Sequence, residues 1–286
     1  MRAALAALVL AACAAPGPPR GLTVVPLGPQ APVTSEEAGE AAQELAAWMA
    51  DGLSAALPDE LTAEDSVLFG KKDEWGRRKS RSALNALDLT GIGWGRGAVV
   101  TLITDSHAIV AAHVPRPVGS LVVFYDKEGF EILRSVAAKT RVPREAGTDL
   151  DLAVVRLDQP VPADIMVYPL PAVAPQVAGR LGLHDAPVLV TYKGRRASVG
   201  SIAGTSAGGL RVLLRKGSRR LGVPEALGHA AERGDSSHPS FWVVDGRMLL
   251  ASHYHADAMA GIGPNYADAR VRAAIEAAIA VLDEAD

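Results

Sequence analysis

The sequence has a single cysteine, Cys13, among its 286 residues, so it cannot form an internal disulfide. It also lacks a strong excess of either charge: the formal net charge is −3, which gives no reason to expect binding to nucleic acid. No internal repeat is visible. What the chain does contain is apolar residues, 49% of the total, enough for a sizeable core in one large domain or two small ones.

A short apolar run near the N-terminus carries one positive charge and ends at Cys13. The run is too short to span a bilayer comfortably and has the features of a signal-peptide core. Its last four residues, Leu10-Ala11-Ala12-Cys13, resemble a bacterial lipobox, in which the cysteine thiol is lipidated and becomes the mature N-terminus. We therefore expect residues 1–12 to be a signal peptide and Cys13 a lipid anchor. The alternative is an ordinary signal peptide with a chance cysteine.

Proline and glycine are frequent in residues 14–33, which predicts an anchor and tether over 13–33. The pattern changes at Thr34, which has the spacing of a capping box with Glu37. Helical spacing follows and predicts a helix over about 35–56, within a helix and irregular lead-in covering 34–91; the apolar positions are Ala41, Leu45, Trp48 and Met49.

The segment 71–81 is basic, with Lys71, Lys72, Arg77, Arg78, Lys79 and Arg81. We interpret it as a solvated loop. Attraction to anionic lipid is the alternative for an anchored protein.

From Ala98 onward, short β-type runs alternate with turn signals, which predicts a barrel or a sandwich. Asp245-Gly246 between two apolar runs is a strong hairpin signal, and residues 126–129 form another turn. Residues 265–282 place apolar side chains on one face and predict an amphipathic helix. The strands are expected near 98–104, 107–112, 119–125, 129–136, 151–157, 187–192, 197–203, 209–214, 240–244 and 247–252.

The stretch 233–241, Arg-Gly-Asp-Ser-Ser-His-Pro-Ser-Phe, holds Ser236 on a tight turn before an apolar strand. Gly234 lowers the steric cost of unusual backbone angles, and the N–H groups of such a turn can converge on a developing oxyanion. A serine nucleophile needs a base, and the base needs an orienting group. The chain supplies both types upstream: an apolar strand runs into Ala-Ala-His113, and Asp151 opens another strand.

These motifs resemble the chymotrypsin-like serine proteases, whose marks are Ala-Ala-His, then Asp-aliphatic-Ala-aliphatic-aliphatic-basic-Leu, then Gly-Asp-Ser-Gly-Gly-Pro, in the same chain order. The resemblance covers about residues 92–282, and Asp88-Leu-Thr-Gly91 resembles a segment of a bacterial branch of the family. It implies two six-stranded antiparallel β-barrels over residues 92–286, with the active site in the cleft between them. An N-terminal helix and a C-terminal helix complete the expected mainly β fold.

The resemblance also implies the roles of the site residues. Ser236 would be the nucleophile, His113 the base, and Asp151 the group that holds the imidazole in its tautomer. The backbone N–H groups of Gly234 and Ser236 would form the oxyanion hole, and no cofactor or metal would be needed. Asp149 is a rival for the orienting role because it lies on the same strand face. We prefer Asp151 because Leu-Ala-Val-Val-Arg-Leu follows it directly.

Three features depart from the family pattern. Ser237 and His238 stand in place of Gly-Gly, and their side chains would narrow the cleft or shift the turn. Asp235 in the animal enzymes pairs with an N-terminus freed by cleavage; no Ile-Val-Gly-Gly segment is present here, so we expect another partner, such as an arginine. Counting back six residues from Ser236 places Ala230 near the floor of the specificity pocket, where no acid favours Lys or Arg substrates.

Histidines near the C-terminus allow a zinc alternative. His253 and His255 would share one strand face, with Asp257 nearby as an oxygen ligand. The full set, His229, His238, His253 and His255, is irregularly spaced, so we prefer surface or cleft-lining histidines.

Two functions therefore compete. The first is a serine endopeptidase of the bacterial cell envelope, held by its N-terminal lipid and acting on a peptide or protein substrate. The second is an inactive protease-fold lipoprotein that binds a peptide or protein partner in its cleft. The complete set of triad residues favours the enzyme, whereas the pair Ser237-His238 favours the binding protein.

Overall fold

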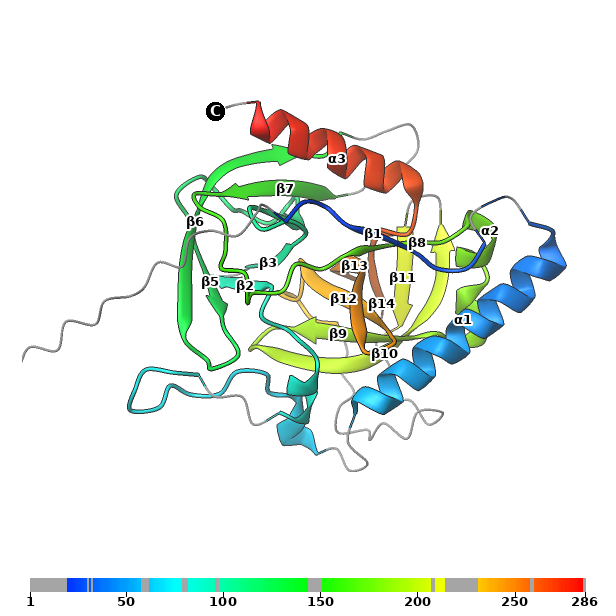
Figure 1. The fold of residues 1–286 in the computed structure, drawn as a ribbon, viewed down its shortest axis with the longest axis horizontal. Helices are drawn as coiled ribbons and strands as arrows, with labels where there is room; N and C mark the ends of the chain where they lie inside the picture. The colour runs from blue at the N-terminus through cyan, green and yellow to red at the C-terminus, as the bar shows by residue number, and fades with distance from the viewer. Residues whose placement is uncertain are drawn as a thin grey trace, which may run out of the picture.

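The computed structural model describes residues 20–29, 31, 33–57, 62–78, 82–95, 98–143, 151–206, 209–213, 231–257 and 260–284. Over these ranges the chain is mainly β, with a long helix near each end (Figure 1). The helical elements are α1 (Ser35–Ala56), η1 (Ala63–Ser66), η2 (Ala83–Ala86), α2 (Pro175–Ala178), η3 (Leu181–His184) and α3 (Ala269–Asp283).

Six antiparallel strands close into a barrel, which we name the N-terminal barrel. Their order is β2-β3-β4-β7-β6-β5. The bounds are β2 (Ile92–Gly95), β3 (Ala98–Leu102), β4 (His107–Ala111), β5 (Leu121–Tyr125), β6 (Glu131–Arg141) and β7 (Leu152–Leu157). The prediction of a mainly β fold with a closed six-stranded antiparallel barrel is thus confirmed.

The other large sheet, which we name the C-terminal sheet, has the order β10-β11-β14-β13-β12-β9, and β9 also pairs with β10. Its strands are β9 (Pro187–Tyr192), β10 (Arg196–Ser206), β11 (Gly209–Leu213), β12 (His238–Val244), β13 (Arg247–Asp257) and β14 (Ala260–Pro264). The predicted Asp-Gly hairpin joins β12 to β13, with φ of 49° at Asp245 and 68° at Gly246. Positive φ at both turn residues is what such a two-residue hairpin requires.

Strands β3 and β4 are mostly apolar because both of their faces are buried at every position. In β3, Val100 packs inside the barrel with Phe124, whereas its neighbour Val99 belongs to a core shared with the C-terminal sheet. Phe241 and Leu250 of that sheet lie in the same shared core. Alternate side chains of a strand point to opposite faces, so a strand between two cores shows no polar alternation.

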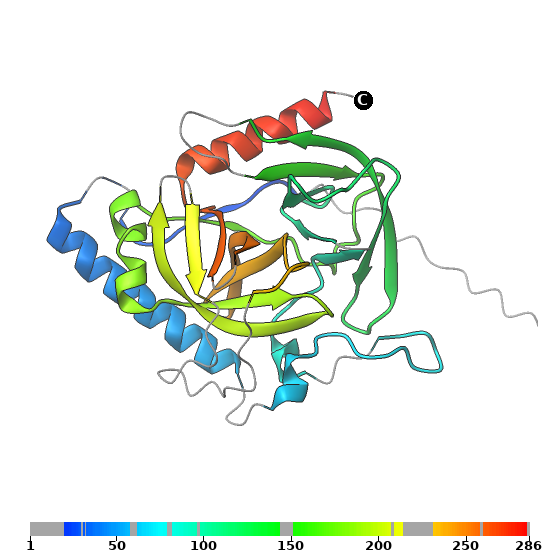
Figure 2. The ribbon, with the colours of Figure 1, turned by 180° about the vertical axis from the view of Figure 1, so that it is seen from behind.

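Helix α1 begins and ends where the sequence predicts, at residues 35 and 56. The capping box is formed: Glu37 N donates to Thr34 Oγ1 at 3.3 Å, and Thr34 N donates to Glu37 Oε2 at 2.8 Å. The helix packs on β9 and β12 of the C-terminal sheet, which Figure 2 shows from behind. Trp48, placed on the apolar face by its spacing, is instead 40% exposed and donates from Nε1 to Asp245 Oδ1 at 2.7 Å.

Helix α3 starts four residues later than the predicted 265, at Ala269, and packs on β6 and β7 of the N-terminal barrel. Asp268 caps it by accepting a hydrogen bond from Arg270 N at 2.8 Å. Partial burial raises the pKa of Asp268, but the hydrogen bonds and the positive charge of Arg270 outweigh this effect and hold the pKa below its usual value. An ionised carboxylate at a helix N-terminus is stabilising.

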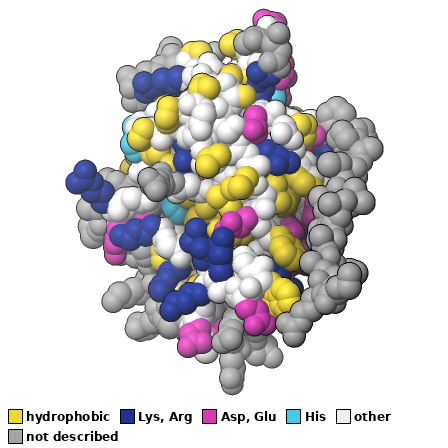
Figure 3. All heavy atoms as spheres, turned by 90° about the vertical axis from the view of Figure 1, so that its left-hand side faces the viewer, with side chains coloured by type: hydrophobic (Ala, Val, Ile, Leu, Met, Phe, Trp, Pro, Cys, Tyr) yellow, Lys and Arg dark blue, Asp and Glu magenta, His cyan; other side chains and the backbone are white. Residues whose placement is uncertain are grey.

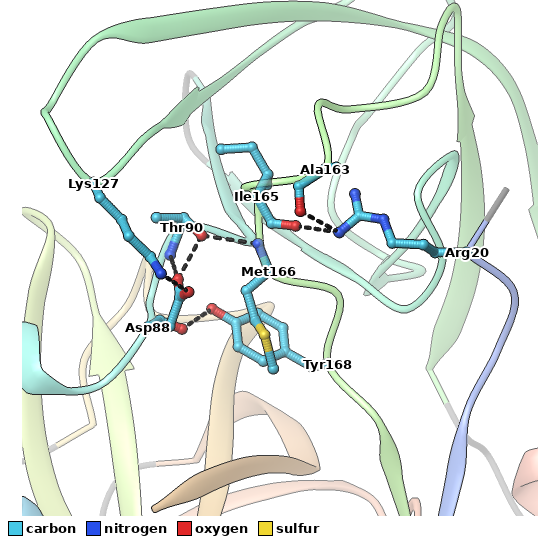
Figure 4. A network of polar contacts seen from close by, with 8 residues as sticks. All are labelled: Arg20, Asp88, Thr90, Lys127, Ala163, Ile165, Met166 and Tyr168. Atoms are coloured by element: carbon cyan, nitrogen blue, oxygen red, sulfur yellow. Dashed lines mark hydrogen bonds and ion pairs between the residues drawn. The ribbon is translucent and has the colours of Figure 1, made fainter. Parts of the chain in front are cut away.

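The prediction of a free tether over 13–33 is wrong for residues 20–27, which pack on the protein. Arg20 donates from Nη1 to the carbonyls of Ala163 and Ile165, at 3.2 and 2.6 Å (Figure 4). The chain then forms β1 (Val24–Pro26), parallel to β8 (Leu170–Ala172), and buries Leu27. Three residues of strand among prolines carry too little periodicity for recognition from the sequence.

The Asp88-Leu-Thr-Gly91 segment holds the connector between the two halves of the molecule, residues 158–169, from the other side (Figure 4). Met166 N donates to Thr90 Oγ1 at 2.9 Å, and the Tyr168 hydroxyl donates to the carbonyl of Asp88 at 3.0 Å. A Cβ on Gly91 would lie 2.0 Å from the Met166 carbonyl oxygen. Only glycine fits at such an approach, so this segment has a packing role.

Candidate active site

His113 and Asp151 are brought together by the pairing of β4 with β7. Ala111 stands opposite Leu152 at the ends of these strands. One step further, Ala112 N donates to the carbonyl oxygen of Asp151 at 2.8 Å. The next residue, His113, therefore lies beside the Asp151 carboxylate because of strand register alone.

The Asp151 carboxylate binds His113 through both of its oxygens. His113 N donates to Oδ1 at 2.9 Å, and the ring Nδ1 lies 2.5 Å from Oδ2. The His113 side chain is half exposed, whereas that of Asp151 is 16% exposed. Asp151 has a φ of 40°, a left-handed conformation that non-glycine residues rarely adopt and that concentrates at functional sites. The ring is thus oriented by a sheltered acid, with its other nitrogen available to a neighbour.

The Ser236 turn is anchored through Asp235, whose side chain is fully buried. Its carboxylate accepts hydrogen bonds from Lys193 N at 3.0 Å and Glu232 N at 2.8 Å. The described partners of the Asp235 carboxylate are thus two backbone amides, and the expected arginine partner stays a prediction. Gly234 has a φ of 101°, as expected for a glycine in a tight turn.

Ser236 follows this anchor and is half-buried. The next residue, Ser237, accepts a hydrogen bond from Ala111 N at 2.9 Å, which ties the turn to the strand that leads into His113. No hydrogen bond joins Ser236 Oγ to the His113 ring among the described residues. Catalytic hydrogen bonds without substrate are often long and tighten only when substrate binds.

The backbone N–H groups of the Ser236 turn differ in their hydrogen bonding. Asp235 N donates to Glu232 O at 3.0 Å and His238 N donates to Asp235 O at 3.2 Å. Within the described chain, the amides of Gly234 and Ser236 make no such hydrogen bond. Amides with unused donors are the groups that can bind a developing oxyanion.

Lys139 adds a cation that the sequence does not mark, because an isolated lysine on a long strand has no motif around it. Its Nζ donates to the carbonyl of Val114, the residue after His113, at 3.2 Å. Burial lowers the pKa of Lys139, as does the charge of Arg116, while the Asp151 carboxylate raises it. Lys139 therefore places a positive charge near the Asp151 carboxylate.

Several predicted positions lie outside the described residues: Cys13, Asp149, His229 and Ala230, together with the side chains of His255 and Asp257. The other two histidines of the zinc alternative are buried in different contacts. His253 Nδ1 is hydrogen-bonded to the Tyr266 hydroxyl, and the His238 ring lies against Trp94. Among the side chains that the structure describes, no three potential metal ligands gather.

Three of the four described Lys and Arg residues of the segment 71–81 pair with acids. Lys72 lies 2.8 Å from Glu131, and Arg77 lies 3.0 Å from Asp73. Figure 3 shows Lys and Arg side chains gathered on the lower half of one face, with acidic side chains beside them. Exposed pairs of this kind contribute little to stability, which fits a solvated surface.

No described helix combines the length and apolar character needed to cross a bilayer. Comparison with models of known protein families and with curated proteins finds no match to this chain.

Proposed function

We propose that the protein is a serine endopeptidase that cleaves peptide bonds through an acyl-enzyme intermediate. The observation that carries the proposal is the His113–Asp151 pair, a half-exposed imidazole held at Nδ1 by a sheltered carboxylate. Two further observations support it: the unused amides of Gly234 and Ser236, and the Ser237 bond that keeps the serine turn on the His113 strand.

In this mechanism Ser236 Oγ attacks the carbonyl carbon of the peptide bond while His113 Nε2 takes its proton. The amides of Gly234 and Ser236 bind the oxyanion that forms. His113 then protonates the leaving amine, and the acyl-enzyme remains. A water deprotonated by His113 hydrolyses that ester and restores Ser236. Asp151 keeps the Nδ1–H tautomer throughout and stabilises the imidazolium.

The proposal includes a chymotrypsin-like arrangement of two six-stranded barrels, with the site between them. It is supported by the closed N-terminal barrel, which carries His113 and Asp151, and by the return pairing of β9 with β10 in the C-terminal sheet, which carries Ser236. Two further proposals come from the sequence alone. Ala230 would lie near the specificity pocket, and the substrate would be a peptide or protein without a preference for Lys or Arg.

The competing function is a catalytically inactive protease-fold protein that binds a peptide or protein in its cleft. The observation that favours it is the pair Ser237 and His238, whose side chains occupy positions that glycines hold in active relatives of this type. Both side chains are buried against the N-terminal barrel, so neither projects into solvent beside Ser236. We therefore favour the enzyme.

A fluorophosphonate probe separates the two functions, because it reacts with a serine only when a base activates it. We expect covalent labelling of the wild type, loss of labelling in Ser236→Ala and in His113→Ala, and retained labelling in the matched variant Ser240→Ala. A folded wild-type protein that takes up no probe would exclude the hydrolase and leave the binding function.

We further propose that the enzyme is anchored to the bacterial cell envelope by lipid on Cys13. Arg20, seven residues later, is already fixed to the protein surface, so a lipid at Cys13 would hold the domain within about 25 Å of the membrane. Cys13→Ser should move the protein from the membrane to the soluble fraction without changing fluorophosphonate labelling. A wild-type protein found soluble with an unmodified N-terminus would contradict the anchor.

A further inference from the structure

The two residues after Ser236 both reach from the C-terminal sheet to the N-terminal barrel. Ser237 Oγ accepts a hydrogen bond from Ala111 N at 2.9 Å. The His238 ring meets the Trp94 ring edge-on, with centroids 5.8 Å apart and an interplanar angle of 62°. The exposed fractions of Ser237, His238 and Trp94 are 1%, 3% and 5%. These two contacts, which we call the junction, therefore join the start of β12 to β4 and β2, and they are shielded from solvent.

Ser237 adopts a backbone conformation that a residue with a side chain seldom takes. Its φ is 75°, in the left-handed region. Such a conformation persists only where the surrounding structure determines it. A glycine would remove the strain, but it would also remove the hydroxyl that Ala111 N binds.

The Ala111 amide needs this partner. Neighbouring Ala112 N donates toward β7, to Asp151 O, so Ala111 N points to the opposite side of β4. On that side β3 pairs with β4 only at Ala108 and Ile109. The ladder has ended by Ala111, and a buried N–H without an acceptor is costly. The Ser237 hydroxyl supplies the acceptor.

We propose that Ser237 is a positioning residue that sets the distance between the two halves of the triad, with His238 on Trp94 supporting the same junction. This rests on the proposed serine endopeptidase function. Ala111 lies two residues before His113, and Ser237 directly follows Ser236. One hydrogen bond thus fixes the base and the nucleophile relative to each other across the boundary between barrel and sheet.

The test compares Ser237→Gly and Ser237→Ala with the matched control Ser240→Ala. Ser240 lies three residues further, is equally buried, and its Oγ has no hydrogen-bond partner among the described residues. We expect both Ser237 variants to lose at least about tenfold in the rate of fluorophosphonate labelling and in kcat for p-nitrophenyl acetate, since small misplacements of reacting groups are costly. KM should change less than about twofold, and Ser240→Ala should match the wild type.

Thermal unfolding distinguishes positioning from a merely structural role. Glycine relieves the strain at φ 75° whereas alanine does not, so Ser237→Gly should melt above Ser237→Ala while both lose the same activity. Activity that follows melting temperature, or a Ser237→Gly enzyme with wild-type kcat, would overturn the proposal. His238→Phe keeps a ring against Trp94 and should label faster than His238→Ala; equal rates would remove His238 from the junction.

Failure of the proposed function is distinguishable from failure of this inference. If the wild type takes up no probe, the hydrolase is excluded, and hydrogen exchange at the Ala111 amide tests the junction directly. Lost protection in Ser237→Gly with unchanged protection in Ser240→Ala would support the bond as the element that joins the two halves. Unchanged protection in both would overturn it.

Discussion

The two halves of the proposed triad are built in different ways. His113 and Asp151 lie at the paired ends of two strands of one barrel, and register alone brings them together. Ser236 lies on a turn whose place depends on Lys193 and Ala111, which come from other parts of the chain. The His113–Asp151 pair is thus formed within one sheet, whereas Ser236 is positioned by contacts between separate elements.

The largest expected effect is a loss of kcat when the His113–Asp151 pair is disrupted. Asp151→Asn keeps the shape of the side chain but supplies the wrong hydrogen-bonding partner to Nδ1, so we expect kcat for p-nitrophenyl acetate to fall on the order of 10⁴-fold. The free energy of unfolding, measured in urea, should change by about 1 kcal/mol or less because the histidine of the pair is half exposed. Asp149→Asn is the control, and a larger loss there would reverse the assignment.

Disrupting the anchor of the Ser236 turn should lower both the stability of the protein and its activity. Asp235→Ala removes a fully buried carboxylate and leaves the amides of Lys193 and Glu232 without it. We expect a loss of about 3 kcal/mol in the free energy of unfolding, together with slower fluorophosphonate labelling. Asp164→Ala, at an exposed position of the connector, is the control. Equal stability of the two variants would remove Asp235 as the anchor of the turn.

The connector between the halves offers a third test. In Gly91→Ala the new Cβ would meet the Met166 carbonyl oxygen at 2.0 Å, so the two segments must separate. We expect a loss of about 2 kcal/mol in the free energy of unfolding. Gly39→Ala, in helix α1 with nothing within 4 Å of the added Cβ, should instead stabilise by about 0.5 kcal/mol. A tolerated Gly91→Ala would show that the close approach is unnecessary.

The smallest effect concerns the pH dependence of stability and the start of β4, at the other end of that strand from Ala111. His107 lies against Thr104 and Asp283, and burial lowers its pKa although Asp283 opposes the shift. The unfolded chain takes up this proton near pH 6.5, whereas the folded chain does so only at lower pH. Stability is therefore full above about pH 7 and decreases as the pH falls through 6.5 toward the folded-state value.

His107→Gln should flatten this part of the curve of unfolding free energy against pH, measured in urea at steps between pH 7.5 and 5. Parallel curves for the variant and the wild type would show that another group is responsible. The active-site half of the barrel should be unaffected, so labelling of Ser236 at pH 7.5 provides the check that the fold is intact.

Much of the fold was predictable because its signals are local. The capping box at Thr34, the hairpin at Asp245-Gly246 and most strand positions follow from periodicity and turn residues within a few positions of each other. Short strands such as β2 and β14 were missed because they hold few residues and several glycines. The docked segment from Arg20 to Leu27 was mistaken for tether because its partners lie more than 80 residues away.

The two long helices and the Asp245-Gly246 hairpin could be predicted from the sequence alone because their signals are local. The pairing of His113 with Asp151 was expected only from the resemblance, and it depends on the register of β4 against β7. The contacts that hold the Ser236 turn follow only from the folded structure. The backbone amides around Asp235 and the bond from Ala111 to Ser237 join residues 42 and 126 positions apart. Backbone amides are the same in nearly every residue, so no pattern of side chains in the sequence predicts which amide will donate to a buried acceptor.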